Sequence, residues 1–257
     1  MYKRQVLDVG RNPLWPRFCE TFGEDPFLVS TLGAELIKGY EQDGLSNPTA
    51  VSSCMKHFIG YSDPKSGKDR TEAYISDITL WQKHIPSFKA AIDAGASTIM
   101  INSSMINDVP VHSSYDLLTD LLRNRLGFKG MIVTDWEDII RLHERHKIAS
   151  TPREAVKIAI NAGIDMSMVP NNYSFCKHLV ELVKAGEIAE SRIDASVRRI
   201  LVLKRNLGLF ENPYPEKEAV KNFGLPEYKE LALKSARESI VLLKNQNQVL
   251  PLKKDKK

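Results

Sequence analysis

The chain has 257 residues, of which 42% are hydrophobic and 26% are charged, and this balance is typical of a globular protein. Its formal net charge is only +4, and the basic residues are spread along the chain apart from a lysine-rich tail. These features argue against nucleic-acid binding, and no apolar run is long enough for insertion into a membrane.

Five short, mostly apolar runs have the composition of buried strands: 6–10, 53–58, 98–102, 131–135 and 164–168. Amphipathic segments separate them, and this alternation is typical of βα units around a parallel sheet. A closed parallel barrel needs eight strands. The sequence therefore predicts an α/β fold, an incomplete (β/α)8 TIM-type barrel, over residues 6–211.

Terminal signals mark several of the helices between these strands. A leucine stripe at 117–122 ends at Gly127, where a left-handed residue is expected after the helix. Thr151-Pro152-Arg153-Glu154 has the pattern of a capping box with proline at the first helical position, and this helix should stop before Gly163. Each signal supports the order of strand, loop and helix.

The segment Asn212-Pro213-Tyr214-Pro215 interrupts this rhythm and predicts an interdomain linker over 212–225. A helical pattern follows at 226–239, and a strand-like run follows at 240–244. We interpret 226–257 as the beginning of a second, α/β sandwich domain. The chain is therefore expected to be a fragment that starts late in the barrel and stops early in the second domain.

The run at 131–138 ends its apolar part on Asp135, and Trp136 follows directly. In a βα barrel, acids at the carboxyl ends of strands face the active-site mouth. An aromatic ring at that place offers an apolar platform for the CH face of a sugar. Because Asp is also a preferred N-cap, the same residue could only cap the next helix. The local pattern leaves both interpretations open.

Cationic side chains occur near the ends of two other predicted strands. Lys56 and His57 lie at the end of the second strand, and Arg11 follows the first. Arg70 lies in a loop rich in Pro, Ser and Gly. Donors of these types bind sugar hydroxyls or orient a carboxylate. An isolated Lys-His pair is more often a satisfied histidine beside a surface lysine.

Taken together, these segments resemble glycoside hydrolase family 3. The motifs that carry the resemblance, in chain order, are NPLWPR, ETFGEDP, KHF, GYSDPKSGKDR, LLTDLLRNRLGFKGMIVTDW and SIVLLKN followed by LPL. No one motif suffices, but the order and spacing of the set resemble the β-glucosidase branch over nearly the whole chain.

The resemblance implies a retaining β-glucosidase that hydrolyses terminal, non-reducing β-D-glucosyl residues. Asp135 matches the nucleophile, which forms a covalent glycosyl-enzyme intermediate. The residues that match binders of glucose hydroxyls are Arg11, Lys56, His57 and Arg70, and Trp136 matches an aromatic residue that stacks on the next sugar. The implied partner is a β-linked glucoside, and no organic cofactor is implied.

Two positions depart from the family pattern. Many relatives carry a tyrosine beside the nucleophile where this chain has serine in Ile101-Asn102-Ser103-Ser104. Relatives also usually have Asn-Gly where this chain has Asn107-Asp108, and Asp adopts left-handed backbone angles less readily than Gly.

The general acid/base of this branch belongs to the second domain, so the resemblance implies that it is missing from this chain. Glu137 and Asp138 lie too close to Asp135 in sequence to stand across a scissile bond from it, and we assign both a structural role. Arg17 and Glu20 are expected to form a structural ion pair. We therefore expect the fragment to be inactive alone and to need the second domain of its parent chain.

Other interpretations remain. The chain could be a non-catalytic, truncated sugar-binding fragment, or part of a β-N-acetylhexosaminidase of the same family. The latter enzymes supply a histidine acid/base from a loop after KHF, but no histidine occurs between His57 and His84. His143 and His146 could share a helix face, but no third metal ligand accompanies them, so no metal site is predicted. Relatives of this branch are frequently exported, which suggests a periplasmic or secreted parent.

Overall fold

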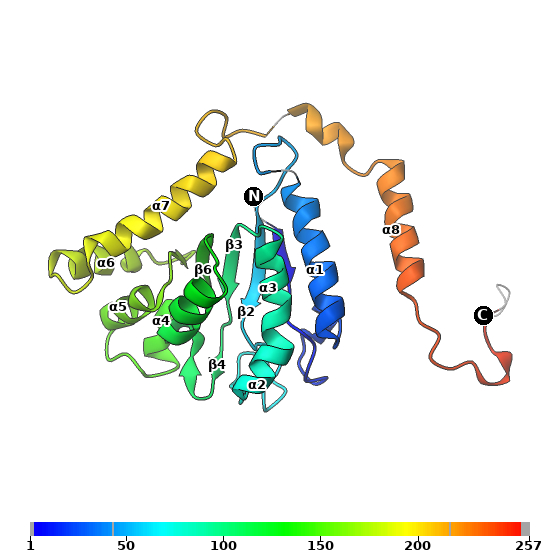
Figure 1. Ribbon diagram of the computed structural model, residues 1–257, viewed down its shortest axis with the longest axis horizontal. Helices are drawn as coiled ribbons and strands as arrows, with labels where there is room; N and C mark the ends of the chain where they lie inside the picture. The colour runs from blue at the N-terminus through cyan, green and yellow to red at the C-terminus, as the bar shows by residue number, and fades with distance from the viewer. Residues whose placement is uncertain (1–2, 43, 216, 253–257) are drawn as a thin grey trace. The chain divides into compact units, whose positions relative to one another are not determined.

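Five parallel strands form a sheet in the order β1-β2-β3-β6-β7 in the computed structural model of the protein (Figure 1). The structure describes residues 3–42, 44–215 and 217–252, and its internal contacts divide the chain into two units, 1–212 and 213–257. The strands are β1 (Lys3–Val6), β2 (Ser53–Phe58), β3 (Thr98–Ile101), β6 (Met131–Trp136) and β7 (Met166–Met168). The parallel α/β fold predicted from the sequence is confirmed.

The predicted and observed strands differ most at the first one. The apolar run at 6–10 predicts a strand, but β1 ends at Val6. Leu7 still donates its backbone N–H to the carbonyl of Lys56 at 2.7 Å, and Leu7 and Val9 are fully buried. The apolar run therefore marks the point where the chain leaves the sheet and enters the core, because burial and strand pairing need not end at the same residue.

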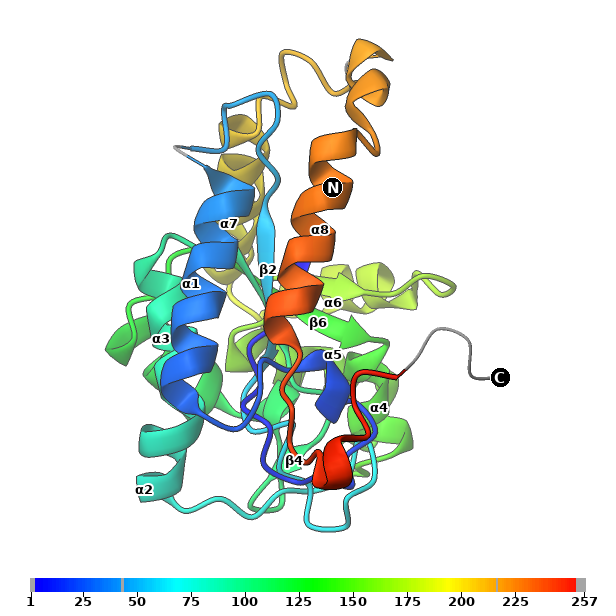
Figure 2. The same cartoon turned by 90° about the vertical axis from the view of Figure 1, so that its right-hand side faces the viewer.

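Helices cover the sheet, and neighbouring helices pack against one another. In both views α1 and α3 lie side by side (Figures 1 and 2). The helical segments of the first unit are η1 (Phe18–Glu20), α1 (Pro26–Glu41), α2 (Asp77–Thr79), η2 (Leu80–His84), α3 (Ile85–Asp93), η3 (Val111–Ser113), η4 (Asp116–Arg125), α4 (Asp138–Glu144), α5 (Pro152–Ala162), α6 (Ser174–Lys184) and α7 (Glu190–Asn206). Within the described ranges, no helix is both long enough and apolar enough to cross a bilayer.

The helix ends follow the sequence signals closely. The Thr151 hydroxyl accepts the backbone N–H of Glu154 at 3.1 Å, as a capping box requires. The reciprocal bond is displaced by one residue, because the Glu154 carboxylate accepts the backbone N–H of Ser150 at 2.6 Å. Gly163, with φ 133°, and Gly127, with φ 76°, end their helices in conformations that favour glycine.

A two-stranded hairpin of β4 (Met105–Ile106) and β5 (Val109–Pro110) was not predicted. Its turn residues Asn107 and Asp108 have φ values of 50° and 66°, so Asp108 does take the left-handed conformation where relatives have glycine. The Asn107 amide accepts the N–H of Ile75 and donates to its carbonyl, both at 2.9 Å. The hairpin therefore fixes the end of the loop that carries Arg70.

The second unit contains η5 (Lys217–Asn222), α8 (Pro226–Ser239) and η6 (Gln246–Gln248). The strand predicted at 240–244 is absent, and those residues have no regular structure. Ile240 and Leu243 are 76% and 91% exposed, since no strand among the described residues pairs with this segment. The linker at 212–225 and the sandwich domain from 226 remain predictions.

Candidate active site

Charged and polar side chains gather where the parallel strands end. Asp8 follows β1, His57 belongs to the end of β2, Ser103 follows β3, and Asp135 is the penultimate residue of β6. Because parallel strands present their carboxyl ends at the same edge of a sheet, these residues share one face of the fold. All four are buried, with 8% or less of each residue exposed.

Asp135 is held by its own backbone and lies near an arginine. Its Oδ1 accepts the backbone N–H of Trp136 at 2.6 Å, and its Oδ2 lies 3.8 Å from Nη2 of Arg70. Burial opposes ionisation, but the Trp136 N–H and the surrounding positive charge outweigh it, and the pKa of Asp135 lies below its ordinary value. The N-cap position of α4 (Asp138–Glu144) is occupied by Glu137, and no side chain forms a capping hydrogen bond there. Asp135 therefore does not cap this helix.

Arg70 lies among acidic groups and makes its hydrogen bond to a serine. Its backbone φ is 58°, and its Nη1 donates to Oγ of Ser103 at 2.8 Å. The same hydroxyl donates to Oδ1 of Asp138 at 2.8 Å. The serine that replaces the family tyrosine therefore links Arg70 to Asp138 and leaves Asp135 without a hydrogen bond from this position. The structural role assigned to Asp138 stays a prediction, and these contacts are what it rests on.

His57 is fixed in one tautomer by its two neighbours. Nη1 of Arg17 lies 3.1 Å from Nε2 of His57, and arginine can only donate, so Nε2 accepts. Nδ1 therefore carries the proton and donates to Oδ2 of Asp8 at 2.9 Å. Asp8 Oδ2 also accepts the backbone N–H of His57 at 3.0 Å. In this arrangement the Nε2 lone pair of His57 is occupied by Arg17, so His57 orients the guanidinium, and Arg17 and Lys56 supply the donors.

Arg17 and Glu20 form the ion pair expected from the sequence, with two hydrogen bonds of 2.8 Å each. The pair also belongs to the site, because Nζ of Lys56 lies 4.0 Å from the Glu20 carboxylate. Arg11 is exposed and makes no hydrogen bond or ion pair among the residues described. These contacts link Lys56, His57 and Arg17, and Arg11 takes no part in them.

Aromatic rings line the same region. Trp136 is 45% exposed and follows Asp135 directly, and its role as a stacking platform stays a prediction. Trp15 and Tyr61 are buried and meet edge to face with ring centroids 5.2 Å apart. The Trp15 indole donates to Oδ1 of Asp69 at 3.0 Å, which fixes the residue next to Arg70.

Sequence reasoning missed Asp8, and it gave Arg17 no binding role. Asp8 alternates with the buried apolar residues Leu7 and Val9, and an acid inside such a run was the available signal. The contact between Arg17 and His57 joins residues 40 positions apart, and no local pattern predicts it.

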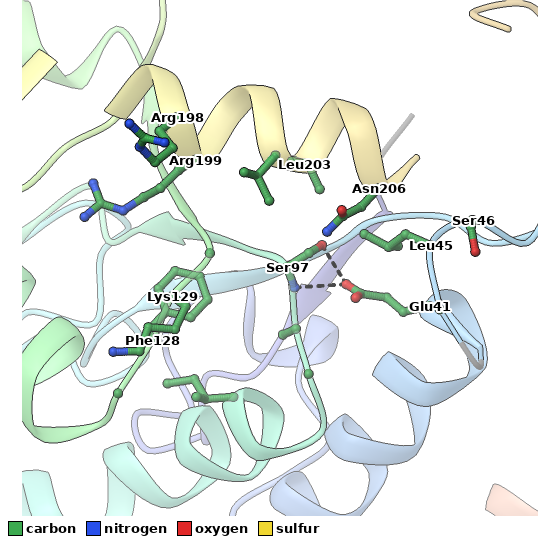
Figure 3. Close-up of a pocket in the computed structure, with 17 residues that line it drawn as sticks. Glu41, Leu45, Ser46, Ser97, Phe128, Lys129, Arg198, Arg199, Leu203 and Asn206 are labelled. Carbon is green, nitrogen blue, oxygen red and sulfur yellow. Dashed lines mark hydrogen bonds between the residues drawn. The ribbon is translucent and has the colours of Figure 1, made fainter. Parts of the chain in front are cut away.

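A cavity of about 830 Å³ lies at the opposite, amino end of the strands (Figure 3). Figure 3 shows Arg198, Arg199 and Leu203 of α7 on one side of it and Glu41 with Ser97 on another. The Glu41 Oε1 atom accepts the backbone N–H of Ser97 at 3.0 Å and its hydroxyl at 2.7 Å. A carboxylate occupied in this way is structural, and chemistry in parallel βα folds takes place at the other end of the strands.

The two histidines considered as metal ligands have other neighbours. His143 Nδ1 lies 2.9 Å from the carbonyl of Ala149, and His146 Nε2 lies 3.2 Å from Nη2 of Arg145. Across the part of the chain that the structure describes, no group of three or more His, Cys, Asp or Glu side chains is placed to hold a metal ion.

The family model described as "Glycosyl hydrolase family 3 N terminal domain" matches residues 5–203. The chain belongs to glycosyl hydrolase family 3. A lysosomal beta glucosidase of Dictyostelium discoideum is 50% identical over 96% of this chain and 31% of its own length. A putative beta-xylosidase of Formosa agariphila is 40% identical over 97% of this chain and 33% of its own length.

Solved structures agree with this family assignment. The beta-glucosidase from Listeria innocua, solved in complex with isofagomine, superposes with a TM-score of 0.90 at 33% identity. The match covers 96% of this chain and 35% of that one. This family 3 chain spans about a third of the length of the curated relatives it matches. The resemblance noted from the motifs, and the incomplete barrel it implied, are confirmed.

Proposed function

We propose that this chain forms the nucleophile half of a retaining β-glucosidase active site, with Asp135 as the nucleophile. The observation that carries the proposal is the environment of Asp135. It is a nearly buried carboxylate at the carboxyl end of a parallel strand, its pKa lies below the ordinary value, and an exposed tryptophan ring follows it. A nucleophile of this kind must be ionised at working pH.

In the proposed reaction an Asp135 oxygen attacks the anomeric carbon of a β-D-glucosyl residue. A glycosyl ester forms as the bond to the leaving oxygen breaks, and that oxygen takes up a proton from a general acid. Water then attacks the ester, giving its proton to the same group acting as a base, and the β configuration is retained. Oδ2 suits the attack, because Oδ1 already accepts the Trp136 N–H.

The sugar hydroxyls would meet the donors around His57. Lys56 and Arg17 offer cationic N–H groups, His57 orients Arg17 through Nε2, and Arg70 lies beside the nucleophile. Neighbouring cationic donors suit vicinal hydroxyls, whose oxygens can accept from them. Trp136 would stack on the sugar beyond the scissile bond.

The proton donor is not evident among the described carboxylates. Glu20 is held by two hydrogen bonds to Arg17, which together with Lys56 keep its pKa below the ordinary value despite partial burial. Asp69 accepts the Trp15 indole N–H and lies 3.8 Å from Nε of Arg70. Glu20 is therefore held in its ionised form, and an ionised carboxylate has no proton to donate. We propose that the acid/base comes from a second domain and expect little turnover of p-nitrophenyl β-D-glucoside by the 257-residue chain.

A probe that needs no acid tests the nucleophile directly. The chain is incubated with dinitrophenyl 2-deoxy-2-fluoro-β-D-glucoside, whose leaving group departs unprotonated and whose fluorine slows hydrolysis of the ester. We expect one fluoroglucosyl group on the peptide that contains Asp135, detected by mass spectrometry, and none on the D135N variant. The D93N variant, which changes an exposed carboxylate on α3, should label like the unmodified chain.

The outcomes separate the alternatives. An adduct on a residue other than Asp135 would refute the nucleophile assignment. No adduct with a folded chain would favour the non-catalytic sugar-binding fragment. Because relatives include β-xylosidases, the matching fluoroxyloside is tested in parallel, and faster labelling by it would replace the glucoside with a xyloside as the preferred substrate.

A further inference from the structure

Arg70 is surrounded by three carboxylates, but it hydrogen-bonds to none of them. One oxygen of each of Asp69, Asp135 and Asp138 lies 3.8 Å from a guanidinium nitrogen. The hydrogen bond that Arg70 makes runs from Nη1 to Oγ of Ser103 at 2.8 Å. Charge-assisted hydrogen bonds of arginine to carboxylate are normally about 2.7–2.9 Å long. Arg70 is therefore held at a distance from its acidic neighbours.

The group that anchors Arg70 is Asp138. The Ser103 hydroxyl donates to Oδ1 of Asp138 at 2.8 Å, and Nη1 of Arg141 donates to the same oxygen at 2.9 Å. Asp138 is 2% exposed, so its position is set by these partners and not by solvent. Since the Ser103 hydroxyl gives its proton to Asp138, its lone pairs are left to accept Arg70. The chain of contacts runs from Asp138 through Ser103 to Arg70.

This distance matters to Asp135. A cation within about 4–6 Å stabilises a carboxylate through its charge. A hydrogen bond from the same cation would occupy a lone pair, and a nucleophile would have to break that bond before it attacks. At 3.8 Å, Arg70 stabilises the charge of Asp135 without a hydrogen bond to its Oδ2 atom. Among the described residues, no group donates a hydrogen bond to this oxygen.

We propose that Asp138 is a positioning residue, which holds Arg70 close enough to Asp135 to stabilise its charge and too far away to hydrogen-bond its attacking oxygen. The proposal rests on the assignment of Asp135 as nucleophile. If Asp138 lost its carboxylate, Arg70 would be released toward Asp135 and would cover Oδ2.

Other titratable or charged groups also face the two carboxylates. His57, Arg70 and His112 lie around Asp135. Asp138 is faced by Arg70, Arg141 and His112, and more distantly by Arg145 and His146. Of these, Arg70 is the cation for which ion-pair distances to both carboxylates are observed, so the test follows Arg70 itself.

The test compares D138A with D138N in the 257-residue chain selectively labelled with ¹⁵N-arginine. The asparagine of D138N can still accept from Ser103 and Arg141, whereas the alanine of D138A cannot. We expect the Arg70 Nη–H signals, assigned by their loss in R70K, to move downfield in D138A as the guanidinium reaches Asp135. They should stay near their original position in D138N, and the downfield shift should be much smaller in D135N/D138A. The E154Q variant, which neutralises a first-turn acid of α5, is the matched control and should leave these signals unchanged.

If D138A does not fold, as judged by circular dichroism, D138S replaces it, because serine also cannot reach Arg70 but offers Arg141 a polar neighbour. Unchanged Arg70 signals in D138A, or in D138S where it replaces D138A, would overturn the proposal. A downfield shift in D138N as large as that in D138A would overturn it too. Fluoroglucoside labelling gives an independent readout, since D138A should label at least about tenfold more slowly than D138N. If the unmodified chain does not label, the nucleophile assignment fails, while the Arg70 signals still decide the role of Asp138.

Discussion

Asp165 at the amino end of the sheet and Asp138 at its carboxyl end are both buried carboxylates, but their surroundings differ. Asp165 accepts from Arg123 and the Ile132 N–H on one oxygen. On the other oxygen it accepts from Ser196 and Arg199. Asp138 concentrates its partners on Oδ1, and its Oδ2 has no hydrogen-bond partner within the described part of the chain.

The same contrast extends to other residues at the two ends. At the amino end, Glu41 gathers the N–H and hydroxyl groups of Ser53 and Ser97 on one oxygen. At the carboxyl end, Asp8 Oδ1, Tyr61 OH and His112 Nε2 are buried without a hydrogen-bond partner among the residues described. Buried polar atoms without partners cost free energy, so proteins retain them where a ligand can satisfy them or where the chemistry needs them. The buried carboxylates at the amino end are hydrogen-bonded within the fold, whereas the carboxyl end has buried polar atoms that no described residue pairs with.

The largest expected effect on stability comes from D165N. This change neutralises the buried carboxylate that pairs with Arg123 and Arg199, and it leaves these partly buried cations without a counter-charge. We expect the free energy of unfolding to fall by about 3 kcal/mol or more. Urea unfolding measures it, with D194N on the exposed side of α7 as the control. A loss below about 1 kcal/mol would contradict the structural role of the amino end.

An intermediate effect on stability is expected when the pH is lowered, because His146, near the carboxyl end of the sheet, becomes protonated. Burial first, and then the charge of Arg145, lower the pKa of His146 to about 4. Because the ordinary value is about 6.5, the unfolded chain binds a proton that the folded chain does not, and stability falls as the pH decreases from about 6.5 toward 4. Urea unfolding at pH 7 and at pH 5 should show that the free energy of unfolding falls, on the order of 1 kcal/mol of it because of His146. The H146Q variant should lack this part of the pH dependence. If the free energy of unfolding depended on pH equally in H146Q and in the unmodified chain, the prediction for His146 would be refuted.

The smallest effect on stability is expected from D135N, the same chemical change as D165N at the other end of the sheet. The asparagine of this variant can still accept the Trp136 N–H that Asp135 accepts. Arg70, at 3.8 Å, loses an ion pair but keeps its hydrogen bond to Ser103. We expect the free energy of unfolding to stay within about 1 kcal/mol of the unmodified chain, although fluoroglucoside labelling is lost. If D135N were as damaging as D165N, the division between the two ends would not hold.

The sequence predicted the elements of the barrel well, because their signals are local. The strand at 53–58 and the helix capped by Thr151 were placed within a residue, since burial on both faces and capping are properties of short segments. The strand predicted at 240–244 was wrong for the same reason. Its apolar composition is local, but a strand also needs a partner, and no pairing strand lies among the described residues.

The site could be predicted only in part. Asp135, His57 and Lys56 stand at strand ends, where position in the motif indicates the role. The tautomer of His57 depends on Asp8 and Arg17, which come from other segments. The restraint on Arg70 depends on Ser103 and Asp138, 33 and 68 positions further along the chain. Such relationships arise when the fold brings distant residues together, and a single sequence holds no local trace of them.

The order of the sheet has a consequence for how the protein is made. Each strand pairs with the strand before it along the sheet, and that order follows the order of synthesis from β1 to β7. A nascent chain can therefore add each new βα unit to an edge that has already formed, without waiting for a distant segment. Assembly on the ribosome would proceed in one direction, and Asp135 would meet Arg70, from the loop after β2, as soon as β6 docks on β3.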